Sequence, residues 1–258
     1  MTTATTNEDW IQEIANLGKG SNLLGSAKNS YSEMKVSETN NYEMSMQTNQ
    51  LLPDGSQQSF QASNVQIPGI SQLLPSLYLC GASVISDKAL EDLAISFVIN
   101  IAPELPDTPL PHSNSDRHVL YLRINAFDLP NSNLSVHFDE VTDMIETVRQ
   151  SGGRTLVHCV AGVSRSTTFC LAYLIKYAGM NLREAFFHTK AIRPQIRPNL
   201  GFFQQLRAYE QHLHGAVSVN MVYYECTQCK IPDVYETEYR AMEDFYQKQR
   251  KFKRLHKY

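Results

Sequence analysis

A cysteine and an arginine separated by five residues stand in the stretch HCVAGVSRS, residues 158–166. The apolar residues Leu156 and Val157 precede this stretch as a short strand, and helical spacing begins near Ser164. A strand that leads through a tight loop into a helix points several backbone N–H groups at one place, which makes a cradle for an anion. Gly162 allows the loop a positive φ or a close approach to that anion.

The side chains of this stretch suit attack on phosphorus. Cys159 lies beneath the cradle, where the helix N-terminus and a nearby cation favour thiolate over thiol. Arg165 can return to the mouth of the loop and hold two anionic oxygens with its planar guanidinium. We therefore expect one loop to surround a phosphate while its cysteine attacks from below. The expected phosphate-binding residues are Val160, Ala161, Gly162, Val163, Ser164 and Arg165.

The pattern His-Cys-x5-Arg-Ser matches the signature of cysteine-dependent protein tyrosine phosphatases. The surrounding segments LVHCVAGVSRSTTFCLAYLIKY and IRPNLGFFQQL resemble the dual-specificity branch, over roughly residues 67–213. Further on, VNMV…IPDVYETEY is similar to the C-terminal extension of small atypical dual-specificity phosphatases. Cys-x5-Arg alone arises by chance, but the strand before it, the helix after it and the downstream RPN make the match specific.

The resemblance implies a general acid on a loop about 30 residues before the nucleophile, which protonates the leaving oxygen and later activates water. Asp128 lies 31 residues before Cys159, between the end of an expected strand and Pro130. Asp139 and Glu140 fall inside the following helix, where charges are usually solvated. We expect Asp128 to be the acid; the alternative is an ordinary turn aspartate.

Four more side chains receive roles. Ser166 is placed to donate to the sulfur of the cysteine and ease departure of the thiolate, whereas Ser164 suits a helix cap. In the family, the residue at His158 supports the loop and tunes the thiolate. Asn199 is expected to brace the active-site loop, and it also suits the cap of a helix over 200–213. The chemistry implied is covalent catalysis through a cysteinyl-phosphate, with no metal or cofactor.

The variable positions of the loop, 160, 161, 163 and 164, carry no charge. Relatives that hydrolyse phosphoinositides tend to have lysines there, so the loop favours phosphoproteins over lipids, with RNA 5′-phosphates left open. The chain also lacks an evident phosphotyrosine-recognition loop, which implies a shallow pocket open to phosphoserine and phosphothreonine. Protein kinases are candidate substrates, although no kinase-docking domain is visible. The rival functions are binding of phosphoproteins without turnover and hydrolysis of RNA or lipid phosphates.

The composition of the chain indicates which broad class of protein it belongs to. Its 258 residues are 42% hydrophobic and 19% charged, with a formal net charge of -3. This near-neutral balance gives no reason to expect nucleic-acid binding, and no apolar run approaches the roughly 20 residues of a transmembrane segment. Five cysteines without framework spacing suit a reducing compartment. We expect a cytoplasmic protein, with the nucleus also open; the oligomeric state is not indicated.

Three regions differ in composition. Residues 1–65 are polar, with three Lys against seven Asp and Glu, and we expect most of this segment to be disordered. Within it, TNEDWIQEIANLG predicts a short helix with Trp10 on its apolar face, which is either a frayed helix or a partner-docking one. Residues 66–214 are the expected catalytic domain. Residues 215–258 form a C-terminal extension that ends in a basic tail.

Strands and helices alternate in the expected catalytic domain, which predicts an α/β fold with a mostly parallel sheet flanked by helices. Strands are expected at SLYLCGA, HVLYLRINAF and RTLVHC, and SDKALEDLAISFVINIA is expected to be a short helix that runs into another strand. Helices are expected over 135–150, 164–178, 181–191 and 199–213, the third capped by Asn181 with Glu184.

Two features of the extension have competing interpretations. Cys226-x-x-Cys229 has metal-ligand spacing, but zinc normally needs a second close pair, so surface thiols are the preferred interpretation. The tail KQRKFKRLHKY has six Lys and Arg and no acid. Such a run suits nucleic acid, an anionic membrane or an import receptor, and more often it is a mobile, solvated tail.

Overall fold

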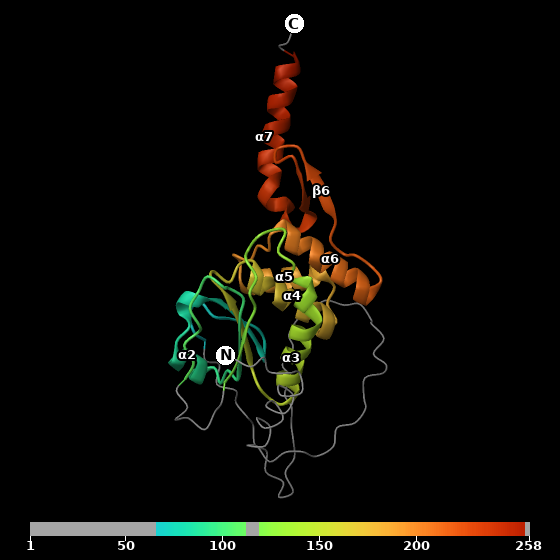
Figure 1. Cartoon of the computed structure of the whole chain (residues 1–258). Coiled ribbons are helices and arrows are strands. Elements are labelled where there is room, and N and C mark those ends of the chain that lie inside the picture. The colour runs from blue at the N-terminus through green and yellow to red at the C-terminus, as the bar shows by residue number, and fades with distance from the viewer. Residues whose placement is uncertain (1–65, 112–118, 256–258) are drawn as a thin grey trace, which may run out of the picture.

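The computed structural model describes residues 66–111 and 119–255. The polar segment 1–65, and with it the helix expected around Trp10, lies outside these residues. In the described part, an α/β body carries a C-terminal hairpin and helix that project from it (Figure 1).

Five strands form the central sheet in the order β1-β2-β5-β3-β4. β1 is antiparallel to β2, and the remaining pairings are parallel. β3 and β5 are buried along their whole length, as expected for apolar strands that are covered on both faces. The expected mostly parallel sheet is confirmed. The strands are β1 Ser71–Leu74, β2 Leu77–Gly81, β3 Phe97–Asn100, β4 Leu120–Arg123 and β5 Thr155–Cys159.

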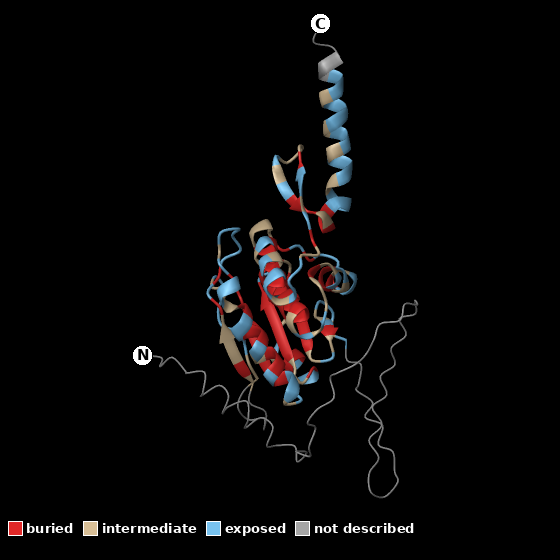
Figure 2. Ribbon diagram, turned by 90° about the vertical axis from the view of Figure 1, so that its right-hand side faces the viewer, coloured by how far each residue is buried: buried red, intermediate tan, exposed pale blue. Residues whose placement is uncertain are grey.

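The strand side chains alternate between two unequal hydrophobic cores. Figure 2 shows that the strands of the central sheet are mostly buried. In β2, Leu77 and Leu79 pack in the larger core with four helices, whereas Tyr78 and Cys80 pack in the smaller core with α2. This period of two is the ordinary consequence of a pleated strand. The helices are α2 Asp87–Asp92, α3 Phe138–Gln150, α4 Arg165–Tyr177, α5 Leu182–Ile192 and α6 Leu200–His214.

The expected helices are present with small differences at their ends. The capping box of α5 is confirmed: the Asn181 side chain accepts from Glu184 N–H, and the Glu184 carboxylate accepts from Asn181 N–H. The segment expected as one helix over 135–150 begins instead with a 3-10 turn at Ser135–His137, and α3 follows from Phe138. Another 3-10 turn, Ala82–Val84, follows β2.

The C-terminal extension is more ordered than the sequence suggested. β6 Met221–Tyr224 and β7 Cys229–Pro232 form an antiparallel hairpin, and a 3-10 turn at Asp233–Tyr235 leads into α7 Glu236–Leu255. Residues 248–255 of the basic tail form the end of α7, which lies against the hairpin. Glu243 accepts from Cys226 N–H at 2.9 Å, and Arg250 binds Glu225. None of the described helices is both long and apolar enough to cross a membrane.

Candidate active site

The loop between β5 and α4, residues 160–165, is called the phosphate loop here. Cys159 ends β5 and Arg165 begins α4, so the sheet and the helix fix both ends of the loop. Gly162 adopts φ +66°, and any Cβ at this position would collide with the backbone of Cys80 on the neighbouring strand. Glycine is therefore required here both for its positive φ and for a close approach, as the sequence suggested. The group that it approaches is the backbone of β2, whereas the sequence analysis expected an anion.

A buried arginine that the sequence analysis did not identify holds the outer side of the phosphate loop. Arg193 is 5% exposed and donates to the carbonyl oxygens of Gly162 at 2.8 Å, Ala161 at 3.0 Å and Gly69 at 3.0 Å. The C=O and N–H groups of a planar trans peptide point in opposite directions. Engaging the carbonyls outside the loop therefore directs the following N–H groups toward its interior.

Cys159 and Ser166 lie together at the base of the loop. Their Sγ and Oγ atoms are 3.1 Å apart, and both residues are buried. This contact has the geometry of a hydroxyl hydrogen bond to sulfur. Ser164, expected as a helix cap, stands at the N-cap position of α4, but its hydroxyl caps nothing. It donates instead to Asp128 Oδ1 at 2.8 Å.

Asp128 is brought to the mouth of the phosphate loop. Its Oδ1 also accepts from Asn199 Nδ2 at 2.8 Å, and its Oδ2 lies 3.9 Å from Arg165 Nε. Asn199 in addition accepts from Phe202 N–H at 3.0 Å, so it caps α6 while it holds Asp128. The Asn199 N–H donates to Ser164 Oγ at 3.1 Å, which joins these three residues into one network.

The guanidinium of Arg165 makes a bidentate ion pair with Glu104, a residue that the sequence analysis did not identify. Nη1 and Nη2 lie 2.9 and 2.6 Å from the two carboxylate oxygens, and Nη1 also donates to Ala126 O at 3.2 Å. Hydrogen bonds from Arg165 hold the pKa of Glu104 below its ordinary value. The Nε atom of Arg165 is buried and has no hydrogen-bond partner among the described residues. The two terminal nitrogens of Arg165 thus face Glu104 in this structure, and Nε lies 3.9 Å from Asp128 Oδ2.

His158 is buried one residue before the cysteine. Its Nε2 lies 2.7 Å from Thr108 Oγ1, and burial lowers the pKa of His158 to about 4. The imidazole is therefore neutral at pH 7, which fits a supporting group better than a proton donor. Thr108 was also missed in the sequence, because it lies in an irregular loop 50 residues away.

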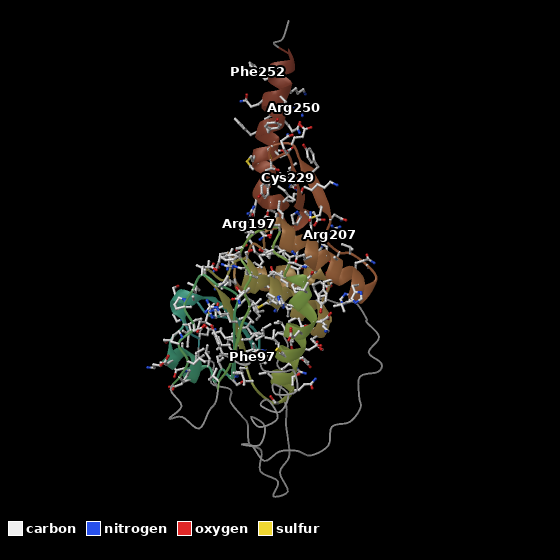
Figure 3. All side chains as sticks on the ribbon, in the orientation of Figure 1. Phe97, Arg197, Arg207, Cys229, Arg250 and Phe252 are labelled. Atoms are coloured by element: carbon white, nitrogen blue, oxygen red, sulfur yellow. The ribbon has the colours of Figure 1, made fainter. Side chains whose placement is uncertain are left out.

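The other four cysteines are of two kinds. Cys80, on the strand beside β5, and Cys170, in α4, lie near Cys159. Cys80 and Cys170 are fully buried, and burial raises the pKa of Cys80 to about 12 and also raises the pKa of Cys170, so both remain thiols at pH 7. Cys226 lies in the turn of the β6–β7 hairpin, and Cys229, labelled in Figure 3, begins β7. Across the described residues, no group of three or more His, Cys, Asp or Glu side chains is arranged to hold a metal ion.

The family comparison agrees with the position of this loop. A family model described as "Dual specificity phosphatase, catalytic domain" matches residues 77–212, which contain every residue of the network above. The chain belongs to the dual specificity phosphatase family. It is 44% identical to mouse dual specificity protein phosphatase 14 over 181 residues, 70% of this chain and 87% of that protein. It is 42% identical to human dual specificity protein phosphatase 18 over 177 residues, 68% of this chain and 90% of that protein.

Solved structures of family members share the fold. Human DUSP28 aligns with a TM-score of 0.53 and 32% identity over 57% of this chain and 95% of that chain. A human tyrosine phosphatase-like serine/threonine/tyrosine-interacting protein aligns with a TM-score of 0.51 and 31% identity over 55% of this chain and 96% of that chain. This dual specificity phosphatase therefore has the α/β architecture of its family, with β5, the phosphate loop and α4 at its centre.

Proposed function

We propose that this phosphatase hydrolyses phosphotyrosine, phosphoserine and phosphothreonine in proteins through a cysteinyl-phosphate on Cys159. The observation that carries the proposal is one network around the phosphate loop. Cys159 lies at its base with Ser166, and Asp128 lies at its mouth, 3.9 Å from the free Nε of Arg165.

In the first step, the Cys159 thiolate attacks phosphorus as the bond to the leaving oxygen breaks. Asp128 donates a proton to that oxygen, which leaves as the hydroxyl of the substrate side chain. The backbone N–H groups of the phosphate loop and Arg165 Nε hold the other three phosphate oxygens. These donors are fixed before the substrate arrives, so they stabilise the charge of the transition state without reorganisation.

In the second step, the Asp128 carboxylate takes a proton from water and the resulting oxygen attacks the phosphoenzyme. The sulfur–phosphorus bond breaks, inorganic phosphate is released and Cys159 returns as thiolate. The Ser166 hydroxyl, 3.1 Å from the sulfur, donates to the departing thiolate and lowers its basicity. Neutral His158 supports the strand end and takes no proton in either step.

The surface next to the phosphate loop supports a peptide substrate. Phe127 and Leu129 flank Asp128 and are 57% and 52% exposed, and Val160 follows Cys159 and is 43% exposed. Uncharged side chains suit the apolar residues of a peptide better than a polyanionic headgroup. Protein kinases in the cytoplasm are the substrates that we propose, with residues 66–214 as the catalytic domain and 215–258 as its extension.

The test is hydrolysis of matched phosphotyrosine and phosphothreonine peptides by the full-length protein, with Cys159→Ser and Asp128→Asn alongside. We expect turnover of both peptides, loss of activity in the first variant and slower turnover in the second. If wild type is no faster than Cys159→Ser on either peptide, the proposal fails. A 5′-phosphorylated RNA and a phosphoinositide are then the next substrates to assay, before a binding role like that named for the serine/threonine/tyrosine-interacting relative is adopted.

A further inference from the structure

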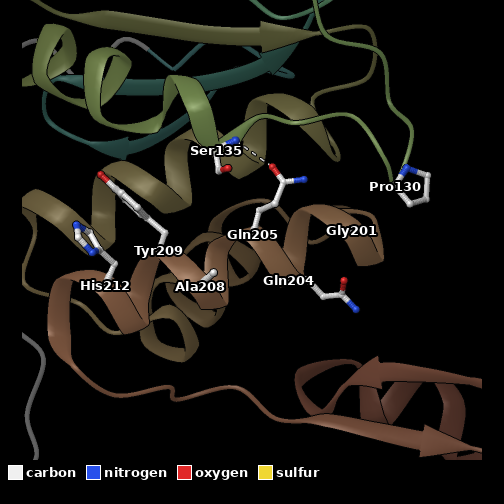
Figure 4. Close-up of a pocket in the computed structure, with 8 residues that line it drawn as sticks. All are labelled: Pro130, Ser135, Gly201, Gln204, Gln205, Ala208, Tyr209 and His212. Atoms are coloured by element: carbon white, nitrogen blue, oxygen red, sulfur yellow. Dashed lines mark hydrogen bonds between the residues drawn. The ribbon is translucent and has the colours of Figure 1, made fainter.

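The segment that carries Asp128 is attached at three places to α6 and its N-cap. This segment, residues 128–137, is called the acid loop here. It connects the segment that follows β4 to the start of α3. On the way it crosses the first two turns of α6, beside an open pocket of about 450 Å³ (Figure 4). The three attachments involve different residues of α6 and its N-cap.

The first attachment is Asn199, whose side chain caps α6 and donates to Asp128. The second is Gly201, one residue into the helix. A Cβ at Gly201 would overlap the carbonyl group of Pro130, so the acid loop rests on the bare backbone of α6 at this point. Neither contact reaches the part of the acid loop beyond Pro130.

The third attachment is Gln205, which uses both ends of its amide. Its Oε1 accepts from Leu134 N–H at 2.8 Å and from Ser135 N–H at 2.9 Å, and its Nε2 donates to Ser132 O at 2.8 Å. Figure 4 shows the side chain reaching from α6 to Ser135. A single side chain thereby satisfies three backbone groups of an irregular loop, which would otherwise have no secondary-structure partner.

The helix that bears these groups is anchored in the core. Phe202, Phe203 and Leu206 are all 0% exposed and lie in the larger core. Gln205 therefore connects the acid loop to a rigid element, so its hydrogen bonds limit how far the loop can shift. Asp128 lies at one end of the loop and Gln205 holds the other, with the Gly201 contact between them.

We propose that Gln205 is a positioning residue for the general acid, holding the acid loop so that Asp128 lies over the phosphate loop. The inference rests on the proposed function, because it assumes that Asp128 protonates the leaving oxygen. Gln205 touches neither substrate nor reacting atoms. Its removal should therefore impair the step that needs the acid and leave phosphate binding intact.

Leaving-group dependence separates this role from a structural one. Esters of strongly acidic phenols depart without a proton, whereas tyrosine needs one. The measurement is kcat/KM of the full-length protein on a phosphotyrosine peptide and on a fluorinated umbelliferyl phosphate. For Gln205→Ala we expect a loss of about tenfold or more on the peptide and less than about threefold on the aryl phosphate. Asp128→Asn should show the same pattern with a larger loss.

Two further variants sharpen the comparison. Gln205→Glu keeps the oxygen that accepts from Leu134 and Ser135 and loses only the donor to Ser132, so it should recover part of the lost rate. Gln204→Ala changes an exposed neighbour whose side chain points away from the acid loop in Figure 4, and it should match wild type on both substrates. Thermal unfolding of each variant identifies one that does not fold.

The outcomes are distinct. An equal loss on both substrates for Gln205→Ala and Gln205→Glu, or no loss for either, would overturn the positioning role while leaving the phosphatase reaction standing. If Asp128→Asn loses rate equally on both substrates, Asp128 is not the acid and the role of Gln205 fails with it. If wild type is no faster than Cys159→Ser, the proposed function itself is wrong.

Discussion

The ion pair between Arg165 and Glu104 orients the guanidinium group of Arg165. Both terminal nitrogens face the Glu104 carboxylate, which leaves Nε toward the site. A bidentate pair fixes the plane of the arginine as well as its position. Glu104 thus acts on the phosphate site without facing it.

We expect Glu104→Gln to reduce kcat/KM on a phosphotyrosine peptide by about 10- to 100-fold and to weaken inhibition by orthovanadate, because Arg165 loses the group that orients it. Glu91→Gln is the matched control, since Glu91 is exposed on α2. Steady-state kinetics on both variants gives the comparison. Equal rates for the two variants would contradict the orienting role of Glu104.

The buried imidazole of His158 makes a prediction about stability and pH. Burial lowers the pKa of His158 to about 4 in the folded state, below the roughly 6.5 of an unfolded chain. Between these values the unfolded state binds the proton and the folded state does not, so stability falls as the pH drops from about 6.5 to 4. At pH 5 the free energy of unfolding is expected to be about 2 kcal/mol lower than at pH 7 because of this residue.

Urea unfolding at pH 7 and pH 5 measures the effect. Wild type should lose about 2 kcal/mol more than His158→Asn over this interval. Thr108→Val removes the hydrogen bond to the imidazole but keeps the imidazole buried, so it should retain the pH dependence. An identical pH dependence in wild type and His158→Asn would show that the ring is already charged or hydrated in the fold.

At the scale of elements, the junction of β5 with α4 depends on the glycine of the phosphate loop. We expect Gly162→Ala to abolish activity and to lower stability by about 2 kcal/mol or more, because both its φ of +66° and the backbone of Cys80 exclude a Cβ. Gly179→Ala separates these causes. Gly179 has nearly the same φ, +67°, but open space around it, so this variant should lose only about 1 kcal/mol and keep full activity.

Activity assays and thermal unfolding of the two alanine variants test this prediction. Loss of activity in both variants would mean that replacing a glycine of positive φ disturbs the whole fold and not the phosphate loop in particular. Retention of activity by Gly162→Ala would mean that the loop tolerates a different path past β2.

The elements that the sequence predicted correctly have strong local signals. The apolar runs of β2, β3 and β5 and the periodic helices α3 to α6 are evident in the residue pattern itself. β1 and the β6–β7 hairpin were not predicted, because their strands are only partly buried and lack the fully buried apolar run that marks β3, a strand of the same length. α7 was underestimated because its order depends on contacts with that hairpin.

The residues of the candidate site also differ in how far local sequence identifies them. Cys159, Arg165, Asp128, Ser166 and Asn199 lie in or near short motifs, and the structure brings all five together. Glu104 lies 61 residues from Arg165, and Arg193 lies 32 residues from Ala161. Their roles depend on partners that only the fold brings near. A signal did exist for Glu104, which lies four residues after the end of the apolar strand β3, at the same sheet edge as Cys159.

At the scale of the whole molecule, the C-terminal extension is joined to the catalytic body beside the phosphate loop. Tyr235 is 1% exposed, packs against Phe186 and Phe203, and donates to Pro198 O at 2.8 Å. Arg197, at this junction in Figure 3, stacks on the Tyr235 ring, and its N–H donates to Val163 O at 2.8 Å. The extension thereby supports the segment that holds the phosphate loop.

We expect deletion of residues 216–258 to lower the melting temperature by several degrees and to reduce activity, because it exposes the apolar surface that Tyr235 covers. Deletion of residues 248–258 alone should have a much smaller effect on both, because the contact between Arg250 and Glu225 joins this part of α7 to the hairpin and not to the catalytic body. Calorimetry and peptide hydrolysis on the two truncated proteins provide the comparison. Equal effects of the two deletions would contradict a supporting role for Tyr235.

The guanidinium of Arg193 has one further consequence, because it binds Gly69 as well as the phosphate loop. The chain that follows residues 1–65 therefore joins the fold beside the active site. Any protein captured by those 65 residues would be tethered there, at an effective concentration set by the length of the linker. Its phosphorylated residues would meet Cys159 in an intramolecular encounter, so a weak peptide substrate could become an efficient one without a single new contact at the phosphate.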